Sequence, residues 1–491
     1  MLANCCTLSK RSSLTKRGIF VVTTRLHERV DQAVEQAMPT IKYIANEVWK
    51  LAELSLQEIK SAQLIMGILQ EQGFTITSTC TAGVPTAFIA EYGSGTSILG
   101  LLAEYDALPG LGNEPVPYRE PRKDQVTSGH GCGHNLLGAG CIGAAIALKN
   151  VVAEQKIPGT IRVYGCAAEE SEGAKVYMAR EGLFKDLDAA LHWHPSSFAE
   201  VSNYRSAAVN QIKIEFLGKG AHAGGSPWLG RSAVHAAELF AHGINLMREH
   251  VEPTARLHYI YESAGLAPNV VPDYARLSLY VRDCDRAHVE TSTAWVKQIA
   301  EGSALATQTT AKVLVYTGFY DLLPNSPLAE RMQVHLEHIG VPAFSEVEQA
   351  FARELQQNYG VEPVGMALET EPLVDENTSM GFSTDVGDVS WNLPTMGCGM
   401  PTMPLGVSVH TWAATACHGM SIGLKGALQA ARVLAWTGID VLTDAELRQA
   451  ARADFERRVR GQPYVSPLSP EMKHPLELPE WITEDALKGV N

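Results

Sequence analysis

Several side chains of this chain are of types that bind metals, and three of them, Glu170, His194 and His410, lie at the ends of short apolar runs. A thiolate, imidazoles and a carboxylate can together hold two divalent ions, zinc suiting the thiolate and manganese the carboxylate and imidazoles. Glu169, a second carboxylate beside the first, could take a proton from metal-bound water. This combination indicates hydrolysis. The five candidate ligands are Cys132, His134, Glu170, His194 and His410.

Two of these ligands lie in the segment Ser-Gly-His-Gly-Cys-Gly-His-Asn, residues 128–135. Cys132 and His134 are two residues apart, so an extended turn lets both face one ion. Three glycines allow the backbone to bend close to a metal. The alternative is a glycine-rich helix entry with an incidental cysteine and histidine, and His130 is a further candidate ligand.

The carboxylates Glu169 and Glu170 directly follow a predicted strand. Adjacent residues diverge along an extended backbone, so one can bind metal while the other faces the water. The alternative is that both acids cap a helix beginning near Ser171, which is a common use of acidic residues.

The histidines are less informative by themselves. His192 and His194 end a predicted strand and alternate onto the same face, yet only one of them need bind metal. His410 lies in an apolar run far along the chain, where a lone histidine is more often a hydrogen-bonded core residue.

Two other motifs do not support rival chemistries. The Gly-x-Gly-x-x-Gly pattern of residues 138–143 has the letters of a dinucleotide fingerprint but falls inside a predicted helix instead of a strand–helix turn. The letters Gly-x-Ser-x-Gly occur at residues 419–423, but no strand-like run comes directly before them, as a nucleophile elbow requires, so a serine hydrolase is poorly supported.

Composition narrows the class of protein. The 491 residues are 45% apolar and 19% charged, as in a globular enzyme, and the length favours two domains. The net charge of −14 argues against a nucleic-acid partner. No uninterrupted apolar run reaches ~18 residues, so no membrane span is expected.

The compartment is predicted from cysteines and from the N-terminus. Nine cysteines, an odd number spread widely through apolar segments, favour reduced thiols and a cytoplasmic protein. Residues 1–27 carry five basic residues, no acid, and many Ser and Thr. This segment is either a disordered start or an organellar targeting peptide.

Secondary-structure patterns predict an α/β catalytic domain. Helical spacing runs from Leu26 to Met38, and further helices are expected over 43–54 and 58–72. Strands at 97–103, 160–164 and 189–191 alternate with helices at 135–152 and 172–183. This order predicts a mixed, largely parallel sheet flanked by helices, with ligands beyond the carboxyl ends of the strands.

A different pattern begins near Gln211. Strands and helices follow in the order β-α-β-β-α-β, which resembles a ferredoxin-like module inserted into the first domain. The expected division is a catalytic domain of residues 28–208 and 320–462, an inserted α+β domain of residues 209–319, and a tail of residues 463–491.

Together the motifs resemble those of the M20 metallopeptidase and amidohydrolase family, from about Leu26 to Arg460. The Cys-Gly-His string is typical of the amidohydrolase branch, which cleaves N-acyl amino acids. Within it, the Trp-His-Pro and His-Thr-Trp strings are similar to B-type subunits of aminobenzoyl-glutamate hydrolases. The motifs are residues 101–109, 131–135, 167–170, 193–195, 218–223, 268–272 and 383–391.

The resemblance implies roles for the site residues. It implies that the five candidate ligands bind two divalent ions, with Glu169 as general base, Asp106 supporting the metal site, and His194 favoured over His192. It also shows a departure, because Glu104 stands where many family peptidases have a metal-binding histidine.

For the inserted domain, the resemblance implies a lid that also forms a dimer. His222 is similar to a histidine that reaches into the neighbouring subunit and polarises the scissile carbonyl. Asn269 and Arg282 match positions that grip substrate, and a guanidinium suits a carboxylate. The expected assembly is a homodimer or a hetero-oligomer with a related subunit.

The leading functional hypothesis is a metal-dependent amidohydrolase that acts on a small N-acyl amino acid, an aromatic acyl-glutamate such as p-aminobenzoyl-glutamate. A second hypothesis is a dipeptidase for unusual dipeptides, including β-alanyl ones. A third is a noncatalytic ligand-binding or partner subunit, although the intact Glu169 and ligand set argue against it.

Overall fold

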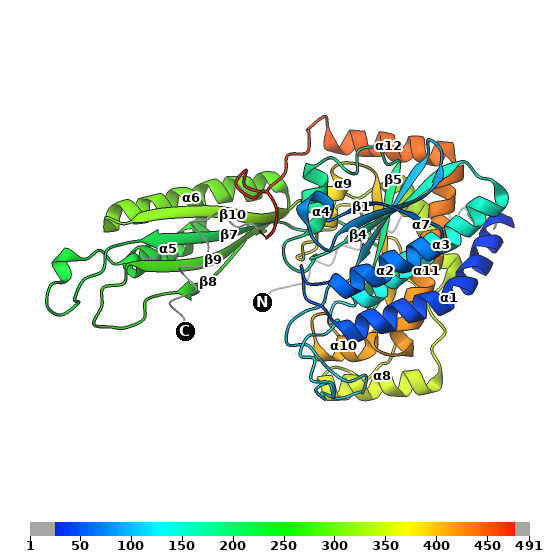
Figure 1. Cartoon of the computed structure of the whole chain (residues 1–491), viewed down its shortest axis with the longest axis horizontal. Coiled ribbons are helices and arrows are strands. Elements are labelled where there is room, and N and C mark those ends of the chain that lie inside the picture. Colours follow the sequence, from blue (N-terminus) through cyan, green and yellow to red (C-terminus); the bar gives the residue numbers. More distant parts are fainter. Residues whose placement is uncertain (1–24, 477–491) are drawn as a thin grey trace, which may run out of the picture.

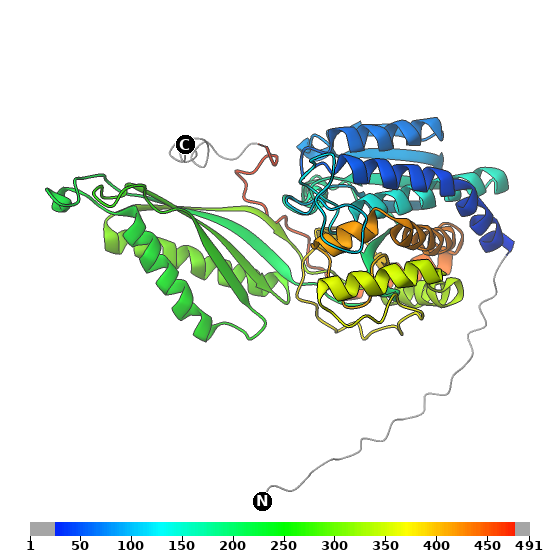
Figure 2. The ribbon, with the colours of Figure 1, turned by 90° about the horizontal axis from the view of Figure 1, so that it is seen from below.

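The computed structural model describes residues 25–476, which form two bodies joined side by side (Figure 1). The larger body is built on a seven-stranded sheet and the smaller on a four-stranded sheet. Figure 2 shows the smaller body projecting from one side of the larger one. Most of the N-terminal segment 1–27 and residues 477–491 of the predicted tail lie outside the described residues.

The large sheet has the strand order β1-β2-β4-β3-β5-β11-β6. Its centre, β4-β3-β5-β11, is parallel, whereas β1, β2 and β6 pair antiparallel at the edges. The predicted fold class is therefore confirmed. The strands are β1 Thr75–Thr79, β2 Phe88–Ser94, β3 Ile98–Glu104, β4 Gly159–Cys166, β5 Ala189–Ser196, β6 Glu200–Val201 and β11 Thr395–Pro401.

Helices bury both faces of this sheet. On one face α3 and α11 pack on the central strands, and α1 packs against both of these helices. On the other face the ring of Tyr164 packs on Phe184, which follows α4. The helices are α1 Arg25–Leu51, α2 Ile59–Glu71, α3 His134–Gln155, α4 Ala174–Arg180, α7 Ser326–Ile339, α8 Glu346–Tyr359, α9 Val386–Ser390, α10 Trp412–His418, α11 Ser421–Thr443 and α12 Ala445–Val459.

The first helix differs from the prediction. The sequence suggested two helices between Leu26 and Leu54, but α1 is one continuous helix that contains Pro39. Its buried stripe continues through the proline, from Val30 and Val34 to Ile41 and Val48. Packing of that stripe on the core outweighs the hydrogen bond that proline cannot donate.

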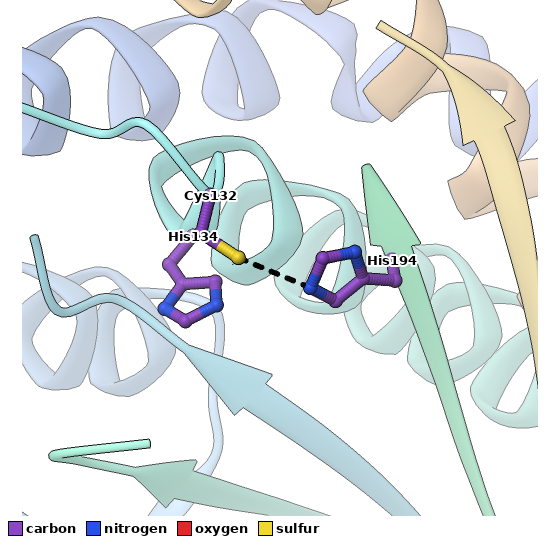
Figure 3. A group of neighbouring side chains, drawn as sticks. All are labelled: Cys132, His134 and His194. Carbon is purple, nitrogen blue, oxygen red and sulfur yellow. Dashed lines mark hydrogen bonds between the residues drawn. The ribbon is translucent and has the colours of Figure 1, made fainter. Parts of the chain in front are cut away.

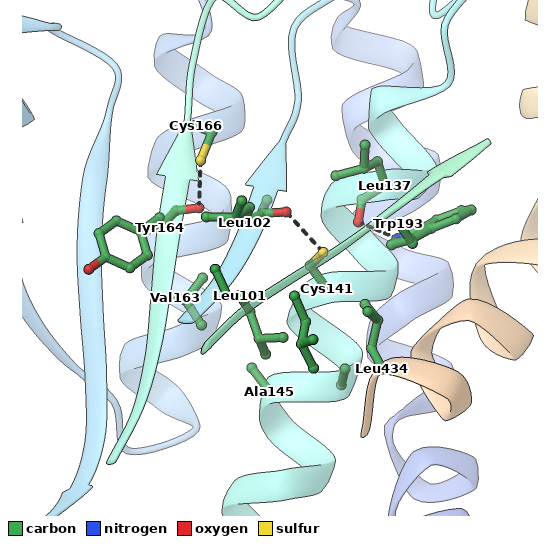
Figure 4. Packing of buried hydrophobic residues seen from close by; sticks show 14 of the residues in the cluster. Leu101, Leu102, Leu137, Cys141, Ala145, Val163, Tyr164, Cys166, Trp193 and Leu434 are labelled. Carbon is green, nitrogen blue, oxygen red and sulfur yellow. Dashed lines mark hydrogen bonds between the residues drawn. The ribbon is translucent and has the colours of Figure 1, made fainter. Parts of the chain in front are cut away.

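The long helix α3 explains the glycine pattern that resembled a dinucleotide fingerprint. A Cβ on Gly140 would lie 2.7 Å from Nε1 of Trp193, and one on Gly138 would lie 2.6 Å from the carbonyl oxygen of Glu104. Trp193 Nε1 donates to the Leu137 carbonyl at 3.0 Å (Figure 4). These glycines let the helix approach the sheet closely, and they lie in the core instead of at a phosphate-binding turn.

Among the described residues, α3 is long and apolar enough to cross a membrane by length and composition alone. However, 83% of its most apolar window is buried inside the protein. Its apolarity is therefore explained by its place in the core.

The inserted body has the strand order β10-β7-β9-β8, all antiparallel. In chain order these are the fourth, first, third and second strands of the unit, as in a ferredoxin-like fold. Helices α5 and α6 cover one face and share a separate hydrophobic core with the strands (Figures 1 and 2). The elements are β7 Ala208–Leu217, α5 Ala233–Met247, β8 Arg256–Ser263, β9 Tyr274–Asp283, α6 Arg286–Thr307 and β10 Thr310–Phe319.

The close approach of α3 to β5 generates a test. Gly140→Ala should lower the free energy of unfolding by about 1–3 kcal/mol, because the added methyl group overpacks the contact with Trp193. The matched control is Gly302→Ala in α6, where a Cβ would meet no described atom within 4 Å. Better helix propensity should make that variant about 0.5–1 kcal/mol more stable.

Urea denaturation of both variants measures the difference. Equal gains in stability at the two glycines would contradict the close packing of α3 on Trp193.

Candidate metal centre

Three of the predicted ligands meet where the start of α3 lies beside the carboxyl end of β5. The ligand atoms of Cys132, His134 and His194 all lie within 4.8 Å of one another (Figure 3). The Sγ of Cys132 is 3.3 Å from Nε2 of His194. These residues come from the turn before α3, from its first position and from the carboxyl half of β5.

The other two predicted ligands form a second group around the same thiol. Cys132, Glu170 and His410 also offer ligand atoms within 4.8 Å of one another, and Nε2 of His410 is 3.2 Å from a carboxylate oxygen of Glu170. Cys132 thus belongs to both groups. All five predicted ligands are therefore brought together, in an arrangement suited to two neighbouring ions.

The donor set fits divalent metal. Oε1 of Glu170 is buried and has no hydrogen-bond partner among the described residues, and Nε2 of His134, also buried, has only the carboxylate of Glu104 at 3.3 Å. Buried polar atoms are almost always satisfied, so two such atoms directed into a cluster of ligands are suited to bind a cation.

Strand register explains why distant residues converge. Glu104 at the end of β3 pairs with Cys166 at the end of β4, so the loops after both strands leave the same edge of the sheet. Glu169 and Glu170 follow β4 there. They do not cap a helix, because α4 begins only at Ala174 and no described side chain caps it. The alternative of helix-capping acids is therefore wrong.

Asp106 orients one of the ligands. Its Oδ1 is 2.8 Å from Nδ1 of His134, and its Oδ2 accepts hydrogen bonds from Ser55 and from the backbone N–H of Glu170. Burial opposes ionisation of Asp106, but the neighbouring His134 lowers its pKa below the ordinary value. Bonding at Nδ1 leaves Nε2 of His134 to face the cluster.

Glu104, which replaces an expected histidine, lies in a buried charge network. Its carboxylate is 3.3 Å from Nε2 of His134 and 2.7 Å from Nζ of Lys175. Lys175 is fully buried and also contacts Asp385 at 2.5 Å. Burial would raise the pKa of Glu104, but the charge of Lys175 lowers it. The sequence carried no signal for Lys175, which lies within a predicted helix.

Glu169 lies close to the ligands and is largely buried. Its carboxylate is 3.8 Å from Nε2 of His134, and its side chain is 12% exposed. Burial raises the pKa of Glu169 well above its ordinary value, and the charges of Glu104 and Asp385 raise it further. Burial and the two neighbouring carboxylates thus both favour the protonated form of this side chain.

A buried carboxylate that sequence reasoning missed supports this loop. Glu58 accepts a hydrogen bond at 2.8 Å from the backbone N–H of Ala168, whose φ of 55° is left-handed. Thr86 donates to its other oxygen. Burial raises the pKa of Glu58 to about 7, with the charge of Asp106 adding to the effect. Glu58 looked like an ordinary acid at a helix start.

The two alternative histidines lie outside these groups. Nε2 of His130 is 3.0 Å from the carbonyl oxygen of Val48, and burial lowers the pKa of His130 to about 3. His192 packs against Gly397, and burial lowers its pKa to about 4. Within the described part of the chain, neither shares a candidate ligand group with Cys132.

The predicted residues of the inserted body lie at its two opposite ends. Arg282, near the end of β9, donates from Nη1 to Ser383 of the larger body at 2.7 Å. His222 and Asn269 lie on loops at the other end, where the N–H of Ala223 donates to the Asn269 carbonyl. The ten residues of β7 separate the two ends by about 33 Å. The chain therefore does not bring His222 and Asn269 to its own ligand cluster.

Comparisons with known proteins agree with these features. The sequence model for peptidase family M20/M25/M40 matches residues 100–473. The chain is 36% identical to the B-type subunit of p-aminobenzoyl-glutamate hydrolase from Escherichia coli (strain K12), covering 90% of this chain and 97% of that protein. It is 26% identical to the Xaa-Arg dipeptidase of Mus musculus, over 89% of this chain and 93% of that one.

A solved structure shares the fold. A Bacillus subtilis protein described as a dinuclear metal binding peptidase from the M20 family superposes with a TM-score of 0.51 at 19% identity, covering 82% of this chain and 99% of that one.

The buried network around Lys175 generates a stability prediction. Lys175→Met keeps much of the side-chain volume but leaves the buried carboxylates of Glu104 and Asp385 without their cation. Breaking a buried ion pair costs about 3–5 kcal/mol, and we expect a loss of that size in urea denaturation. Lys297→Met, at an exposed position of α6, should change stability by no more than about 0.5 kcal/mol.

A double variant tests the cause. Lys175→Met combined with Glu104→Gln should recover part of the loss, because the amide removes one unpaired charge. If Lys175→Met alone were as stable as the wild type, the three groups would not form an energetic network.

Proposed function

The chain belongs to the peptidase family M20/M25/M40, and on that premise we propose that it is a metal-dependent amidohydrolase of N-acyl amino acids. The proposed substrate class is an aromatic acyl-glutamate such as p-aminobenzoyl-glutamate. The observation that carries the proposal is the convergence of five ligands with Glu169. The likeness to the B-type subunit of p-aminobenzoyl-glutamate hydrolase, over most of both chains, supports the substrate class.

In this proposal Cys132, His134 and His194 hold one divalent ion, and Cys132, Glu170 and His410 hold a second. The ions, zinc or manganese, would supply Lewis acidity toward water and the amide carbonyl. Asp106 keeps His134 in the tautomer that presents Nε2 to the cluster.

Glu169 is proposed as the general base. It takes a proton from the attacking water and later delivers that proton to the leaving nitrogen of the amide. Its position near His134 supports this role.

Substrate binding is proposed to involve two subunits. Arg282, near the junction of the two bodies, would bind the substrate carboxylate bidentately. His222 and Asn269 are too far along the inserted body to reach their own cluster, so we assign them to the site of a partner subunit. Nδ1 of His222 accepts hydrogen bonds from the backbone N–H groups of Gly224 and Gly225. Nε2 is therefore left to polarise the scissile carbonyl.

A dipeptidase is the second candidate, and the likeness to an Xaa-Arg dipeptidase favours it. Turnover of p-aminobenzoyl-glutamate against a dipeptide panel, with zinc or manganese supplied, separates the two. Faster turnover of dipeptides than of p-aminobenzoyl-glutamate would favour the dipeptidase over the leading proposal. A metallated protein that hydrolyses neither would favour the noncatalytic subunit.

Glu169→Gln should retain metal and fold but lose activity. The amide is nearly isosteric and cannot accept the proton of the water, and loss of a general base costs ~10²–10⁴-fold in kcat. Metal content is measured alongside turnover, and Glu181→Gln on the exposed surface is the control. A fully metallated Glu169→Gln with the kcat of the wild type would refute the assignment.

A shared site predicts complementation between two inactive variants. When Glu169→Gln and His222→Ala subunits exchange at random, about half the dimers are hybrids with one intact site, so about a quarter of wild-type activity should return. Native mass spectrometry verifies the hybrids. If verified hybrids remain inactive, His222 does not act across subunits.

A further inference from the structure

A cavity next to His410 is lined, apart from His410 itself, by residues that the proposed mechanism does not use. It has a volume of about 540 Å³ and lies between the loop of residues 110–127, the end of α8 and the start of α10. The lining side chains that matter here are Leu111, Tyr359, His410 and Trp412.

The wall of the cavity is joined to the candidate metal centre by backbone contacts. The N–H of His410 donates to the carbonyl of Gly131, the residue before Cys132, at 2.9 Å. A Cβ on Gly131 would lie 2.6 Å from Leu111 Cδ1 and 3.3 Å from Cα of His410. One wall of the cavity is therefore built on the same turn that presents the thiol, and His410 belongs to both sites.

One wall of the cavity is aromatic, although polar residues and two arginines line other parts of it. The rings of Tyr359 and Trp412 pack edge to face with centroids 6.2 Å apart. Both are partly buried on a small hydrophobic cluster that includes Leu355 and Val407, which holds them in place. Such a preformed pair offers a rigid surface to a flat ring.

The buried cation at this cavity is already paired. Arg122 donates to Asp124 and to the backbone carbonyls of Trp49 and Lys50, and its guanidinium lies over the Trp49 ring. It therefore belongs to the wall and is not available to bind the charged end of a substrate. The exposed Arg119 also lines the cavity, so it is the wall formed by Tyr359 and Trp412 that favours an aromatic occupant.

The volume of the cavity indicates how large its occupant can be. Pockets of about 300–1,000 Å³ hold ligands of several rings. A single benzoyl group next to His410 would fill only part of this space, whereas a benzoyl group extended at its para position would reach the far wall.

We propose that this cavity is the acyl-group subsite, and that it selects aromatic acyl groups longer than one ring by contact with Tyr359 and Trp412. The inference rests on the proposed function, because it requires cleavage at the cluster that includes His410. In this arrangement the glutamate side of the substrate lies toward Arg282, and the acyl group lies toward α8 and α10.

The test compares three glutamate conjugates that differ only in the acyl group: acetyl, p-aminobenzoyl and p-benzamidobenzoyl. The wild type should show a rising kcat/KM along the series. Trp412→Ala and Tyr359→Ala should each lower the ratio of kcat/KM for p-benzamidobenzoyl-glutamate over acetyl-glutamate by about tenfold. Trp412→Phe should restore most of that ratio. Trp295→Ala, on the exposed surface of α6, should leave it unchanged.

A binding measurement keeps this test separate from the proposed function. Titration calorimetry of the metal-free protein with p-benzamidobenzoate should show binding that Trp412→Ala weakens by a similar factor. If the metal-loaded wild type hydrolyses none of the three conjugates, the proposed function is overturned. In that case the calorimetry alone would test whether the cavity binds the aromatic group. Equal effects of Trp412→Ala on all three conjugates, or calorimetric binding that does not depend on Trp412, would overturn the acyl subsite.

Discussion

The need to compensate buried negative charge shapes the centre of this protein more than any other requirement. Removing a carboxylate from water is costly unless a cation or hydrogen bonds compensate its charge. Several carboxylates are nevertheless buried at one edge of the large sheet. Lys175, fully buried, compensates Glu104 and Asp385, and His134 compensates Asp106. The ligand cluster lies beside them, where bound divalent ions would add further positive charge.

Burial and the neighbouring charges also give these carboxylates different pKa values. Lys175 and His134 hold the pKa values of Glu104 and Asp106 low despite burial. Burial raises the pKa of Asp385 to about 6 even though Lys175 opposes it, and it raises that of Glu169 further above its ordinary value. Neighbouring carboxylates in one buried region therefore differ in how readily they ionise.

Much of the catalytic architecture was predictable because it depends on local patterns. Apolar runs ending in ligand residues identified β3, β4 and β5, and the order of elements after Gln211 identified the ferredoxin-like body. Prediction was wrong for α1, where core packing carries the helix through Pro39. The edge strands β1, β2 and β6 and the central β11 were not predicted. Their sequences carry little alternation, and pairing with neighbours stabilises them.

The amino-acid sequence was sufficient to identify the chemical types at the site and the strands they follow, because side-chain identity and alternation are local properties. The folded chain was needed to show which of His192 and His194 joins Cys132, and that Lys175 pairs with Glu104. It was also needed to show that His222 lies a full strand length from its own cluster. These outcomes depend on sheet order and register, which set distances between residues that are far apart along the chain.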